Sequence, residues 1–435
     1  MNIRKFQDVN MGNKKILLRV DYNVPMKDGH VAEDTRIVQT IPTIKYLLKQ
    51  NTKVILVSHL GRPDGKVVEG MRMTPIAKHL SKLLKKPVKK LDESIGPKVE
   101  KAVAAMKPGN IVFLENIRFH KGEEKNDPAF AKKLASLADI YVSDSFATAH
   151  RAHASTAGVT KFLPSYGGFL MQKEVEMLSP LLQKAEKPLT VIMGGAKIDT
   201  KIGIIENFLS KADYFLIGGG LANTFLAAEG FNVGKSLYET DKIETAQNTL
   251  LEAESLHEKF ILPIDAVVAD EVKENAQTLT VPVEDVLGDM RILDIGSKTI
   301  AKFVEVIKKS KTVIWNGPLG LSEMKPFRRG TAVIAQTLVW SPKIKSIIGG
   351  GDTVDAIKRV GFKESHFTFV STGGGAMLEF LEGKMLPGVQ VLLEKRTVKK
   401  SLKKTAPKRK TIKKSAKKVS RKRKVDKLRK TGKKR

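Results

Sequence analysis

The stretch Leu18–Pro25, which reads LRVDYNVP, carries three polar side chains at the end of an apolar run. Ile16–Val20 has the composition of a buried strand, and Arg19, Asp21 and Asn23 stand where that strand would pass into a loop. Open α/β sheets bind ligands at the carboxyl ends of their strands. Arginine offers a planar fork to a phosphate or carboxylate, and Asp and Asn accept hydrogen bonds from hydroxyl groups. The stretch therefore favours a small, anionic, hydroxylated ligand, although an isolated Arg-x-Asp pair is more often a structural ion pair.

Three later stretches in the first half of the chain repeat this arrangement. His59–Pro63, Glu115–His120 and Asp144–His153 each follow a short apolar run, and each places an arginine just beyond a predicted strand. A single arginine is usually a solvated surface residue, but the repetition favours one binding site for a highly charged phosphorylated metabolite. The set expected at this edge consists of five arginines and one histidine: Arg19, Arg36, His59, Arg62, Arg118 and Arg151.

The second half of the chain is marked by glycine-rich turns that follow apolar runs. Such turns between a strand and a helix expose backbone amides to anions and commonly hold nucleotide phosphates. In Gly194–Lys201, Lys197 and Lys201 would lie on one face if a helix began there. Asp352, at the mouth of another such turn, is a hard oxygen ligand suited to Mg²⁺ shared with phosphates. The strands predicted in this half are Thr190–Met193, Tyr214–Ile217, Thr312–Trp315, Ile347–Ile348 and Phe367–Val370.

One segment imitates a phosphate-binding loop. Gly230–Ser236 resembles a Walker A loop but has three residues between its glycines where that motif has four. The preceding segment, Leu221–Glu229, is rich in alanine and predicted to be helical, so no strand leads into the loop. We interpret Gly230–Ser236 as a surface turn.

Taken in order, these stretches resemble the phosphoglycerate kinase family over roughly residues 1 to 395. The resemblance implies reversible phosphoryl transfer between 1,3-bisphosphoglycerate and MgADP, which yields 3-phosphoglycerate and MgATP, with Mg²⁺ as the cofactor. It implies that Arg36, Lys197 and Lys201 act in catalysis and that Asp352 serves the metal. The phosphoglycerate-binding residues carried over by matching position are Asp21, Asn23, Arg36, His59, Arg62, Arg118 and Arg151. The nucleotide-binding residues are Ala196, Lys197, Lys201, Gly219, Gly220, Asn316, Glu323, Gly351, Asp352 and Thr353.

Alternating strands and helices predict an α/β protein with two Rossmann-like parallel-sheet domains that face a cleft and are joined by a helix and a hinge. The linking helix is expected at Gln172–Ala185 and the hinge near Ser371 and Thr372. The family architecture implies that the last folded segment returns to the first domain. The expected divisions are a phosphoglycerate-binding domain at 1–168, a linking helix at 169–187 and a nucleotide-binding domain at 188–372. A segment at 373–395 is expected to return to the first domain, and a disordered basic tail is expected at 396–435.

Two positions depart from the family pattern. Ser322 stands where the family usually has phenylalanine, and Ala147 stands where glycine is common. The first change affects packing near the nucleotide ribose, and the second affects a loop close to Arg151. Neither removes a charged group that the chemistry needs, so we expect them to alter affinity and leave the type of reaction unchanged.

Composition predicts a cytoplasmic enzyme. The chain has no cysteine, which excludes disulfides and cysteine metal sites. Its N-terminus lacks the apolar run of a signal peptide, and no stretch approaches 18 uninterrupted apolar residues. The resemblance suggests a monomer, and the net charge of about +13 outside the tail disfavours self-association at low salt.

The last 35 residues differ from the rest of the chain. Residues 401–435 hold 19 Lys or Arg and one acid, Asp426, so they carry +18 of the net charge of +31. They contain no aromatic residue and few apolar ones, which predicts disorder. The tail is either a solvated extension or a site for non-specific, salt-sensitive binding of DNA, RNA or another polyanion such as a nucleoid.

Three functions are consistent with these features. The first is an active glycolytic kinase with a polycationic tail. The second is a nucleic-acid-associated protein that keeps an inactive kinase scaffold, and the third is a kinase of this fold with another acyl-phosphate substrate. The complete set of charged site residues favours the first.

Overall fold

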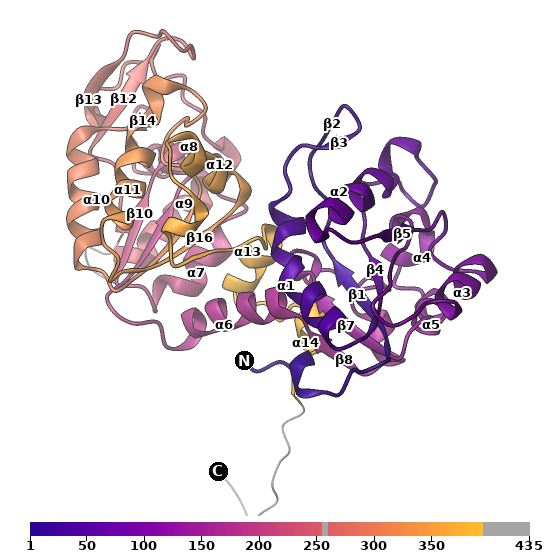
Figure 1. Cartoon of the computed structure of the whole chain (residues 1–435). Coiled ribbons are helices and arrows are strands. Elements are labelled where there is room, and N and C mark those ends of the chain that lie inside the picture. The colour runs from indigo at the N-terminus through magenta and orange to yellow at the C-terminus, as the bar shows by residue number, and fades with distance from the viewer. Residues whose placement is uncertain (255–259, 395–435) are drawn as a thin grey trace, which may run out of the picture. The chain divides into compact units, whose positions relative to one another are not determined.

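The computed structural model describes residues 1–254 and 260–394, so the predicted basic tail lies outside the described residues. These residues form an α/β fold around two six-stranded sheets, and the strands paired within each sheet run parallel (Figure 1). Among the described residues, the helices are too short or too polar to span a membrane.

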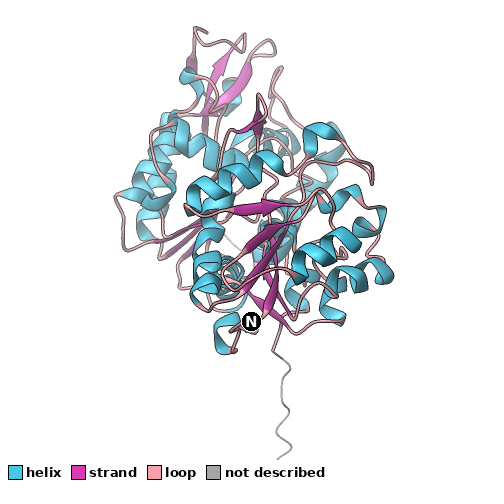
Figure 2. Cartoon of the chain, turned by 45° about the vertical axis from the view of Figure 1, so that its right-hand side comes forward, coloured by secondary structure: helices cyan, strands magenta, loops and turns pink. Residues whose placement is uncertain are grey.

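The first sheet has the strand order β5-β6-β4-β1-β7-β8. Side chains alternate along β1, because successive residues of a strand point to opposite faces. Ile16 and Leu18 pack in one core with helices α1 and α2, whereas Leu17 packs in another core with α3 and α5. Helices therefore cover both faces of this sheet (Figure 2). The strands are β1 (Lys15–Val20), β4 (Lys53–Val57), β5 (Val88–Lys90), β6 (Ile111–Phe113), β7 (Ile140–Asp144) and β8 (Ser165–Gly167). The helices are α1 (Thr35–Lys49), α2 (Thr74–Leu84), α3 (Pro97–Ala104), α4 (Lys121–Glu124) and α5 (Pro128–Ala135).

The second sheet has the order β11-β10-β9-β15-β16-β17. Its strands are β9 (Leu189–Met193), β10 (Tyr214–Ile217), β11 (Phe260–Ile261), β15 (Thr312–Asn316), β16 (Lys345–Gly349) and β17 (Phe369–Val370). Its helices are α7 (Ile202–Leu209), α8 (Gly219–Ala228), α9 (Ile243–Glu254), α10 (Ser297–Lys309), α11 (Arg329–Val339) and α12 (Gly351–Arg359). The predicted strands of both halves are present, since uninterrupted apolar runs are typical of strands buried on both faces.

Two smaller sheets complete the strands. One is antiparallel, with β12 (Asp265–Ala269) between β13 (Leu279–Pro282) and β14 (Arg291–Ile295). The other is the hairpin of β2 (Met26–Lys27) and β3 (His30–Val31). The 3₁₀ turns are η1 (Phe6–Asp8), η2 (Glu69–Met71), η3 (Ile117–Phe119), η4 (Phe146–Thr148), η5 (Gly158–Lys161), η6 (Thr240–Lys242), η7 (Val283–Asp285), η8 (Lys325–Phe327) and η9 (Glu364–His366).

Helix α6 (Phe169–Gln183) connects the two large sheets and begins three residues before the predicted start. Its buried Glu174 accepts hydrogen bonds from Ser371 Oγ at 2.7 Å and from the Thr372 backbone amide at 2.8 Å. After α13 (Gly375–Leu381) and α14 (Pro387–Gln390), the chain returns to the first sheet's half. There the Arg4 backbone amide donates to Leu392 O at 2.9 Å.

Candidate active site

The basic residues of the first half come from loops at the carboxyl ends of adjacent parallel strands. Arg19 lies within β1 and Asp21 follows it, His59 follows β4, and Arg118 lies in η3 after β6. Parallel strands end at the same edge of a sheet, so these side chains come together. The predicted clustering of Asp21, His59 and Arg118 is therefore present.

Arg19 does not face a ligand as the sequence suggested. Its side chain is 1 % exposed, because it lies between the sheet and the segment around Ser155. Its Nε donates to Ser155 Oγ at 2.8 Å, and one terminal nitrogen lies 3.3 Å from His59 Nδ1. The expectation that Arg19 belongs to the ligand-facing set is therefore wrong; it supports His59 from inside the protein.

Asp21 organises the next layer of the cluster. Its Oδ2 accepts a charged hydrogen bond of 2.6 Å from Arg36, which reaches it from the first turn of α1. Its Oδ1 lies 3.7 Å from His59 Nδ1. Arg36 remains about a third exposed, at 34 % of its side-chain area, so it can still meet an anion. Asn23 is exposed, and its Oδ1 accepts from the Gly61 backbone amide at 2.9 Å.

Arg118 is held in place at two points. It donates to Gly61 O at 2.8 Å, and its Nε lies 3.1 Å from Glu124 Oε1. Burial lowers the pKa of the Arg118 guanidinium, although Glu124 opposes this effect. Arg62 and Arg151 are exposed on their loops. Arg151 Nε donates to His150 Nε2 at 3.1 Å, and within the described residues neither arginine pairs with a carboxylate, in contrast to Arg118.

The cluster has a strongly positive potential. Burial lowers the pKa of His59 well below its usual range, and the nearby charges of Arg19 and Arg118 lower it further. Burial likewise lowers the pKa of His153 to about 4, again helped by neighbouring arginines. Both imidazoles are therefore neutral at pH 7, and an anion is needed to balance the arginines. The fully buried carboxyl group of Glu123 accepts hydrogen bonds from the amide and hydroxyl of Ser155. Burial raises the pKa of Glu123, although the charge of Arg19 opposes this effect.

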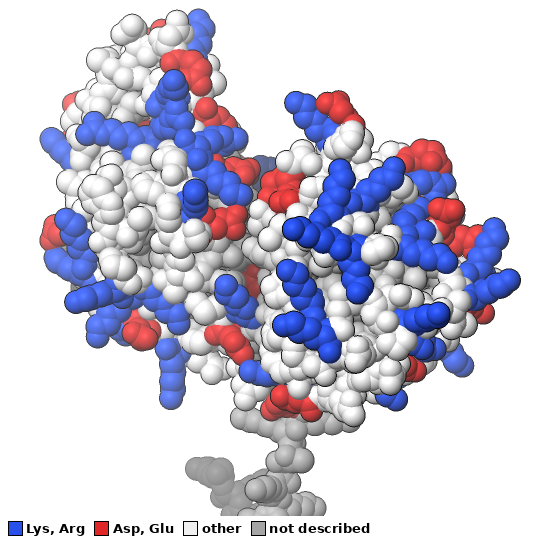
Figure 3. Space-filling model, in the orientation of Figure 1, with Lys and Arg blue, Asp and Glu red and all other residues white. Residues whose placement is uncertain are grey.

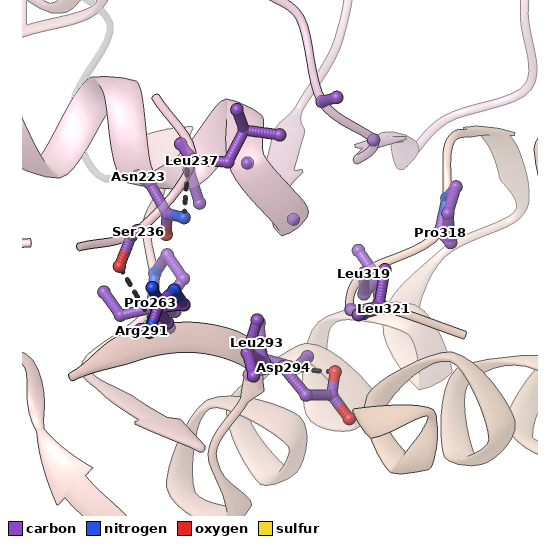
Figure 4. Close-up of a pocket in the computed structure, with 18 of the residues that line it drawn as sticks. Asn223, Ser236, Leu237, Pro263, Arg291, Leu293, Asp294, Pro318, Leu319 and Leu321 are labelled. Atoms are coloured by element: carbon purple, nitrogen blue, oxygen red, sulfur yellow. Dashed lines mark hydrogen bonds between the residues drawn. The ribbon is translucent and has the colours of Figure 1, made fainter. Parts of the chain in front are cut away.

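The second sheet borders a cavity of about 590 Å³ (Figure 4). Its lining comes from helix α8, strand β14, the turns after β9 and β15, the segment after α8, and single residues after β11, after β12 and at the start of α12. Its size lies within the usual range for a small-molecule site. Five residues predicted from the sequence to bind nucleotide line it: Ala196, Gly219, Gly220, Glu323 and Asp352.

Gly219 shows why glycine is required in this wall. Its φ is +63°, a left-handed conformation that side chains disfavour, and an added Cβ would lie 2.7 Å from the Gly195 backbone nitrogen. The two glycine turns that follow β9 and β10 therefore approach each other closely. This contact shapes the end of the cavity.

The two candidate lysines have different surroundings. Lys201 is buried and its Nζ donates to Asn316 Oδ1 at 2.8 Å, whereas Lys197 is exposed. Burial lowers the pKa of Lys201 to about 8, while the charge of Asp352 acts in the opposite direction. Helix α7 begins only at Ile202, so the two lysines do not share one helical face. The Gly-rich segment continues as a turn up to Lys201 and delays the helix.

Five of the predicted nucleotide residues do not line the cavity: Lys197, Lys201, Asn316, Gly351 and Thr353. Asn316 donates to Gly349 O at 2.9 Å, and Thr353 Oγ1 accepts from the Gly317 amide at 2.6 Å. Gly351 is the first residue of α12, followed directly by Asp352. These bonds tie the turn after β15 to the turn after β16. Asn316 and Thr353 therefore position Lys201 and the helix start that carries Asp352.

Most of the apolar cavity wall could not be identified from the sequence. Its side chains come from the segments around β12 and β14 and from the turn after β15, where they look like ordinary core residues. Asn223, on α8, is buried and its Oδ1 has no hydrogen-bond partner within the described residues, which leaves an acceptor in the wall. The unpredicted lining residues include Leu237, Pro263, Val272, Ile292, Leu293, Leu319 and Leu321.

The interpretation of Gly230–Ser236 as a surface turn is wrong in part. The segment is not fed by a strand, as predicted, because α8 precedes it. Lys235 and Ser236 nevertheless line the cavity, and buried Ser236 accepts from the Ile292 amide at 2.8 Å. The bond anchors the segment to β14 (Figure 4).

Ser322, which replaces the usual family phenylalanine, is fully buried beside the cavity-lining Leu321 and Glu323. Its hydroxyl has no hydrogen-bond partner among the described residues. An unpaired buried hydroxyl is unfavourable, so the position does not gain from the polar group. Glu323 itself is half exposed and lies 3.2 Å from Arg359.

The metal-binding groups beside the cavity fit a divalent cation only if a nucleotide supplies further oxygen ligands. Asp352 offers an exposed carboxylate at the first turn of α12 and lines the cavity. In residues 1–254 and 260–394, three or more His, Asp or Glu side chains do not gather into a metal site. Mg²⁺ usually takes one or two carboxylates and completes its shell with phosphate oxygens and water. One carboxylate beside a nucleotide-sized cavity fits that pattern.

Comparison with known proteins agrees with this architecture. The family model described as phosphoglycerate kinase matches residues 6–384. Phosphoglycerate kinase of Pelotomaculum thermopropionicum is 51 % identical over 389 residues, which cover 89 % of this chain and 98 % of the relative. That of Dictyoglomus turgidum is 51 % identical over 393 residues, covering 90 % and 99 %.

Solved structures give the same result. Phosphoglycerate kinase from Coxiella burnetii superposes with a TM-score of 0.82 at 40 % identity, covering 90 % of this chain and 99 % of that one. The enzyme from Pyrococcus horikoshii OT3 superposes with a TM-score of 0.77 at 32 % identity, covering 90 % and 98 %. With its matched length, its two parallel sheets and its paired sites, this chain belongs to the phosphoglycerate kinase family.

Proposed function

We propose that this chain catalyses reversible, Mg-dependent phosphoryl transfer between 1,3-bisphosphoglycerate and ADP, forming 3-phosphoglycerate and ATP. The observation that carries the proposal is the pairing of two unlike sites in one member of this family. A cluster of arginines lies at the end of the first sheet. A nucleotide-sized cavity lies at the end of the second sheet, and the buried Lys201 stands next to Gly195, which lines that cavity. An anionic metabolite and a nucleotide suit these two sites.

The phosphoglycerate would be held by the residues around Asp21. We assign charge pairing to Arg36, Arg62, Arg118 and Arg151, because guanidinium groups bind phosphate and carboxylate through two parallel hydrogen bonds. Asp21 and Asn23 would meet hydroxyl groups, and the neutral His59 would complete the site. Arg118 is already positioned by Gly61 and Glu124, which lowers the entropic cost of binding.

The nucleotide would occupy the cavity of the second sheet. Its apolar wall suits a base, and the turns at Ala196 and Gly220 would offer backbone amides to phosphates, whereas the Gly219 amide already donates to Leu319 O at 2.9 Å. Glu323 would serve the ribose, and Asp352 would hold Mg²⁺ with the phosphates. When bound, Mg²⁺ supplies positive charge to the phosphate oxygens. Asn316, Gly351 and Thr353 would act on the nucleotide through the turns that they fix.

The reaction requires charge neutralisation and no general base. In the ATP-consuming direction the acceptor is a carboxylate, which is ionised at neutral pH and has no proton to lose. Arg36, Lys197 and Lys201 would neutralise the phosphoryl group in transit. Lys201 is the strongest candidate among them, because a buried ammonium acts in a medium that screens charge poorly.

We further propose that the enzyme closes about a hinge, since an acyl phosphate must be protected from water. The proposed moving parts are a first domain that ends at residue 168, a linking helix that ends at 187, a second domain that ends at 372 and a return segment that ends at 395. The bonds from Glu174 to Ser371 and Thr372 support a hinge there, because they join the linking helix to the end of β17. We place the enzyme in the cytoplasm as a monomer that needs no membrane.

The decisive test is MgATP-dependent phosphorylation of 3-phosphoglycerate by the full chain, coupled to NADH oxidation by glyceraldehyde-3-phosphate dehydrogenase. We expect robust turnover that disappears when Mg²⁺ is chelated. Absence of turnover in the folded protein would indicate an inactive scaffold. Turnover with a different carboxylate and none with 3-phosphoglycerate would indicate another acyl-phosphate substrate.

The basic tail supports a second proposed activity. Residues 401–435 carry a net charge of +18, and each lysine that meets a phosphate releases a counterion. We expect removal of the tail to leave turnover unchanged within about twofold while weakening DNA or RNA binding by at least about tenfold at low salt. Polyanion binding that is unchanged without the tail would contradict this assignment.

A further inference from the structure

The positive charge of residues 1–394 is concentrated in their first half. Residues 1–168 contain 29 basic and 16 acidic residues, for a net charge of +13, whereas residues 169–394 contain 25 basic and 29 acidic residues, for a net charge of −4. Figure 3 shows broad blue areas over the part of the surface that carries α1 and α2. The arginines of the substrate cluster explain only part of this excess. The rest of the net positive charge of residues 1–168 lies outside the substrate cluster.

Much of the remainder lies in four loops that lead into the strands of the first sheet. These loops are 11–15, 49–53, 85–88 and 105–111, and none of them contains an acidic residue. Because the strands run parallel, their starts share one edge, opposite to the edge that carries the substrate cluster. We call the cations of these loops the lysine edge: Lys14, Lys15, Lys49, Lys53, Lys85, Lys86 and Lys107.

Backbone contacts place these loops side by side. The Lys53 amide donates to Lys14 O at 2.9 Å, and the Gly109 amide donates to Thr52 O at 2.7 Å. Lys86 Nζ lies 3.8 Å from where a Cβ on Gly109 would stand. The strand order β5-β6-β4-β1 gives the same sequence of neighbours. The lysine edge is therefore continuous across four strands, a width of about 14 Å.

The placement is unfavourable for an isolated enzyme. Lys15 and Lys53 are register partners on adjacent strands, where like charges repel. Among the described residues, the seven ammonium groups form no ion pair with a carboxylate. Asp139, at the start of β7, is the neighbouring acid, and it accepts from the Lys15 backbone amide at 2.8 Å. Helix dipoles favour cations at the ends of α1 and α2, near Lys49 and Lys85, but they do not explain the lysines at strand starts.

We propose that the lysine edge is a second binding surface, which takes the phosphate backbone of a nucleic-acid duplex. Lysine ammonium groups act as point charges for phosphates, and a duplex presents about one charge per 1.7 Å of its axis. The four loops contain no large apolar side chain that is exposed in the structure, so they support neither insertion into lipid nor stacking on bases. Binding at this edge has no sequence preference and leaves the substrate edge free.

The proposal is separable from the tail, because residues 1–394 form one compact unit. Two solved structures of the family are matched over 99 % and 98 % of their chains by 90 % of this chain, so folded members of the family have this length. The test therefore uses the chain ending at Glu394. Fluorescence anisotropy measures its binding to a short DNA duplex over a salt series from about 50 mM to about 200 mM.

The edge variant combines Lys14→Gln, Lys49→Gln, Lys86→Gln and Lys107→Gln. All four side chains are exposed, so the fold should persist, and melting temperature checks this. The matched control carries the same charge change on the second half, with Lys298→Gln, Lys302→Gln, Lys308→Gln and Lys343→Gln, which are exposed too. Lys→Arg changes at the four edge positions restore the charge and test for rescue.

We expect the edge variant to bind the DNA duplex at least about tenfold more weakly than the parent chain. The slope of log K against log salt concentration should become shallower by up to about 3.6, whereas the control variant should change affinity less than about twofold. The Arg variant should bind as the parent does, and the duplex should not compete with 3-phosphoglycerate. Equal losses in the two Gln variants, no binding by the parent chain at low salt, or competition with the substrate would each overturn the proposal. Binding to anionic phospholipid vesicles in place of the duplex would assign the edge to a membrane and overturn it equally.

Discussion

The two large sheets offer their ligands different kinds of site. At the end of the first sheet the proposed binding groups are arginines, and a second layer of Asp21 and Glu124 pairs with Arg36 and Arg118. At the end of the second sheet the groups are glycine turns, apolar side chains and one buried lysine.

This difference follows from the ligands proposed for the two sites. A small, highly charged metabolite has little apolar area, so charge must supply its affinity. A nucleotide has a base that can be buried and phosphates that backbone amides can hold. Mutations that remove a charge or an apolar side chain, and changes in ionic strength or pH, should therefore affect the two sites differently.

The largest effect is expected from Lys201→Ala. If the buried ammonium group of Lys201 neutralises the phosphoryl group in transit, as proposed, its removal should reduce kcat by about 100-fold or more, because that contribution is made in the transition state. Steady-state kinetics with both substrates saturating would measure this. Lys298→Ala, an exposed lysine on α10, serves as the control and should leave kcat unchanged. An unchanged kcat in Lys201→Ala would contradict the proposal that Lys201 acts in catalysis.

Arg118→Gln should affect mainly the phosphoglycerate. A hydrogen bond to a charged group contributes about 1.5–3 kcal/mol, so KM for 3-phosphoglycerate should rise about 10- to 150-fold. KM for ATP should change little. Raising ionic strength should increase the first KM more than the second in the parent enzyme, because screening weakens charge pairing.

Arg328→Gln in the second half provides the comparison for charge loss alone. Equal increases in both KM values for Arg118→Gln would show that the two sites do not differ as proposed.

Lys201 also predicts a pH dependence that separates the sites. Its pKa of about 8 means that it is charged below that pH and loses its proton as the pH rises through it. We expect kcat/KM for the nucleotide to fall above about pH 8 in the free enzyme. In Lys201→Arg the guanidinium stays protonated, so whatever activity remains should lack this fall. An unchanged alkaline limb in that variant would assign the titration to another group.

A smaller effect is expected from Leu237→Asn in the cavity wall. Leu237 is 66 % exposed without ligand, and loss of its burial against a base should weaken nucleotide binding about five- to tenfold. Leu279→Asn, on β13 and 58 % exposed outside the cavity, is the matched control. Isothermal titration with ADP would compare them. Equal behaviour of the two variants would place the base elsewhere.

Prediction from the sequence succeeded where a local pattern has one meaning. Apolar runs such as Ile16–Val20 and Tyr214–Ile217 are strands because they are buried on both faces. Glycine turns were recognisable because conformations such as that of Gly219 need glycine. The order of these signals predicted the fold and the family correctly, and the roles of the charged site residues stay predictions.

Prediction was wrong or incomplete where distant segments meet. Arg19 looked like a ligand residue, but Ser155 and His59 enclose it. Helix α7 starts later than the spacing of Lys197 and Lys201 suggested. The turn at Gly230–Ser236 became part of the cavity because Ser236 bonds to β14. The local sequence around each of these residues does not predict the contact, because the partner lies far away in the chain.

The sequence by itself determined the two sheets, the glycine turns and the excess of positive charge, because these depend on composition and on short-range periodicity. The tertiary structure decided which cations are free and which are enclosed, because burial and hydrogen bonding depend on residues far apart in the chain. It also brought the separate lysines of four loops into one edge, since parallel pairing aligns strand starts. Charge is a property of the residue, whereas its accessibility is a property of the fold.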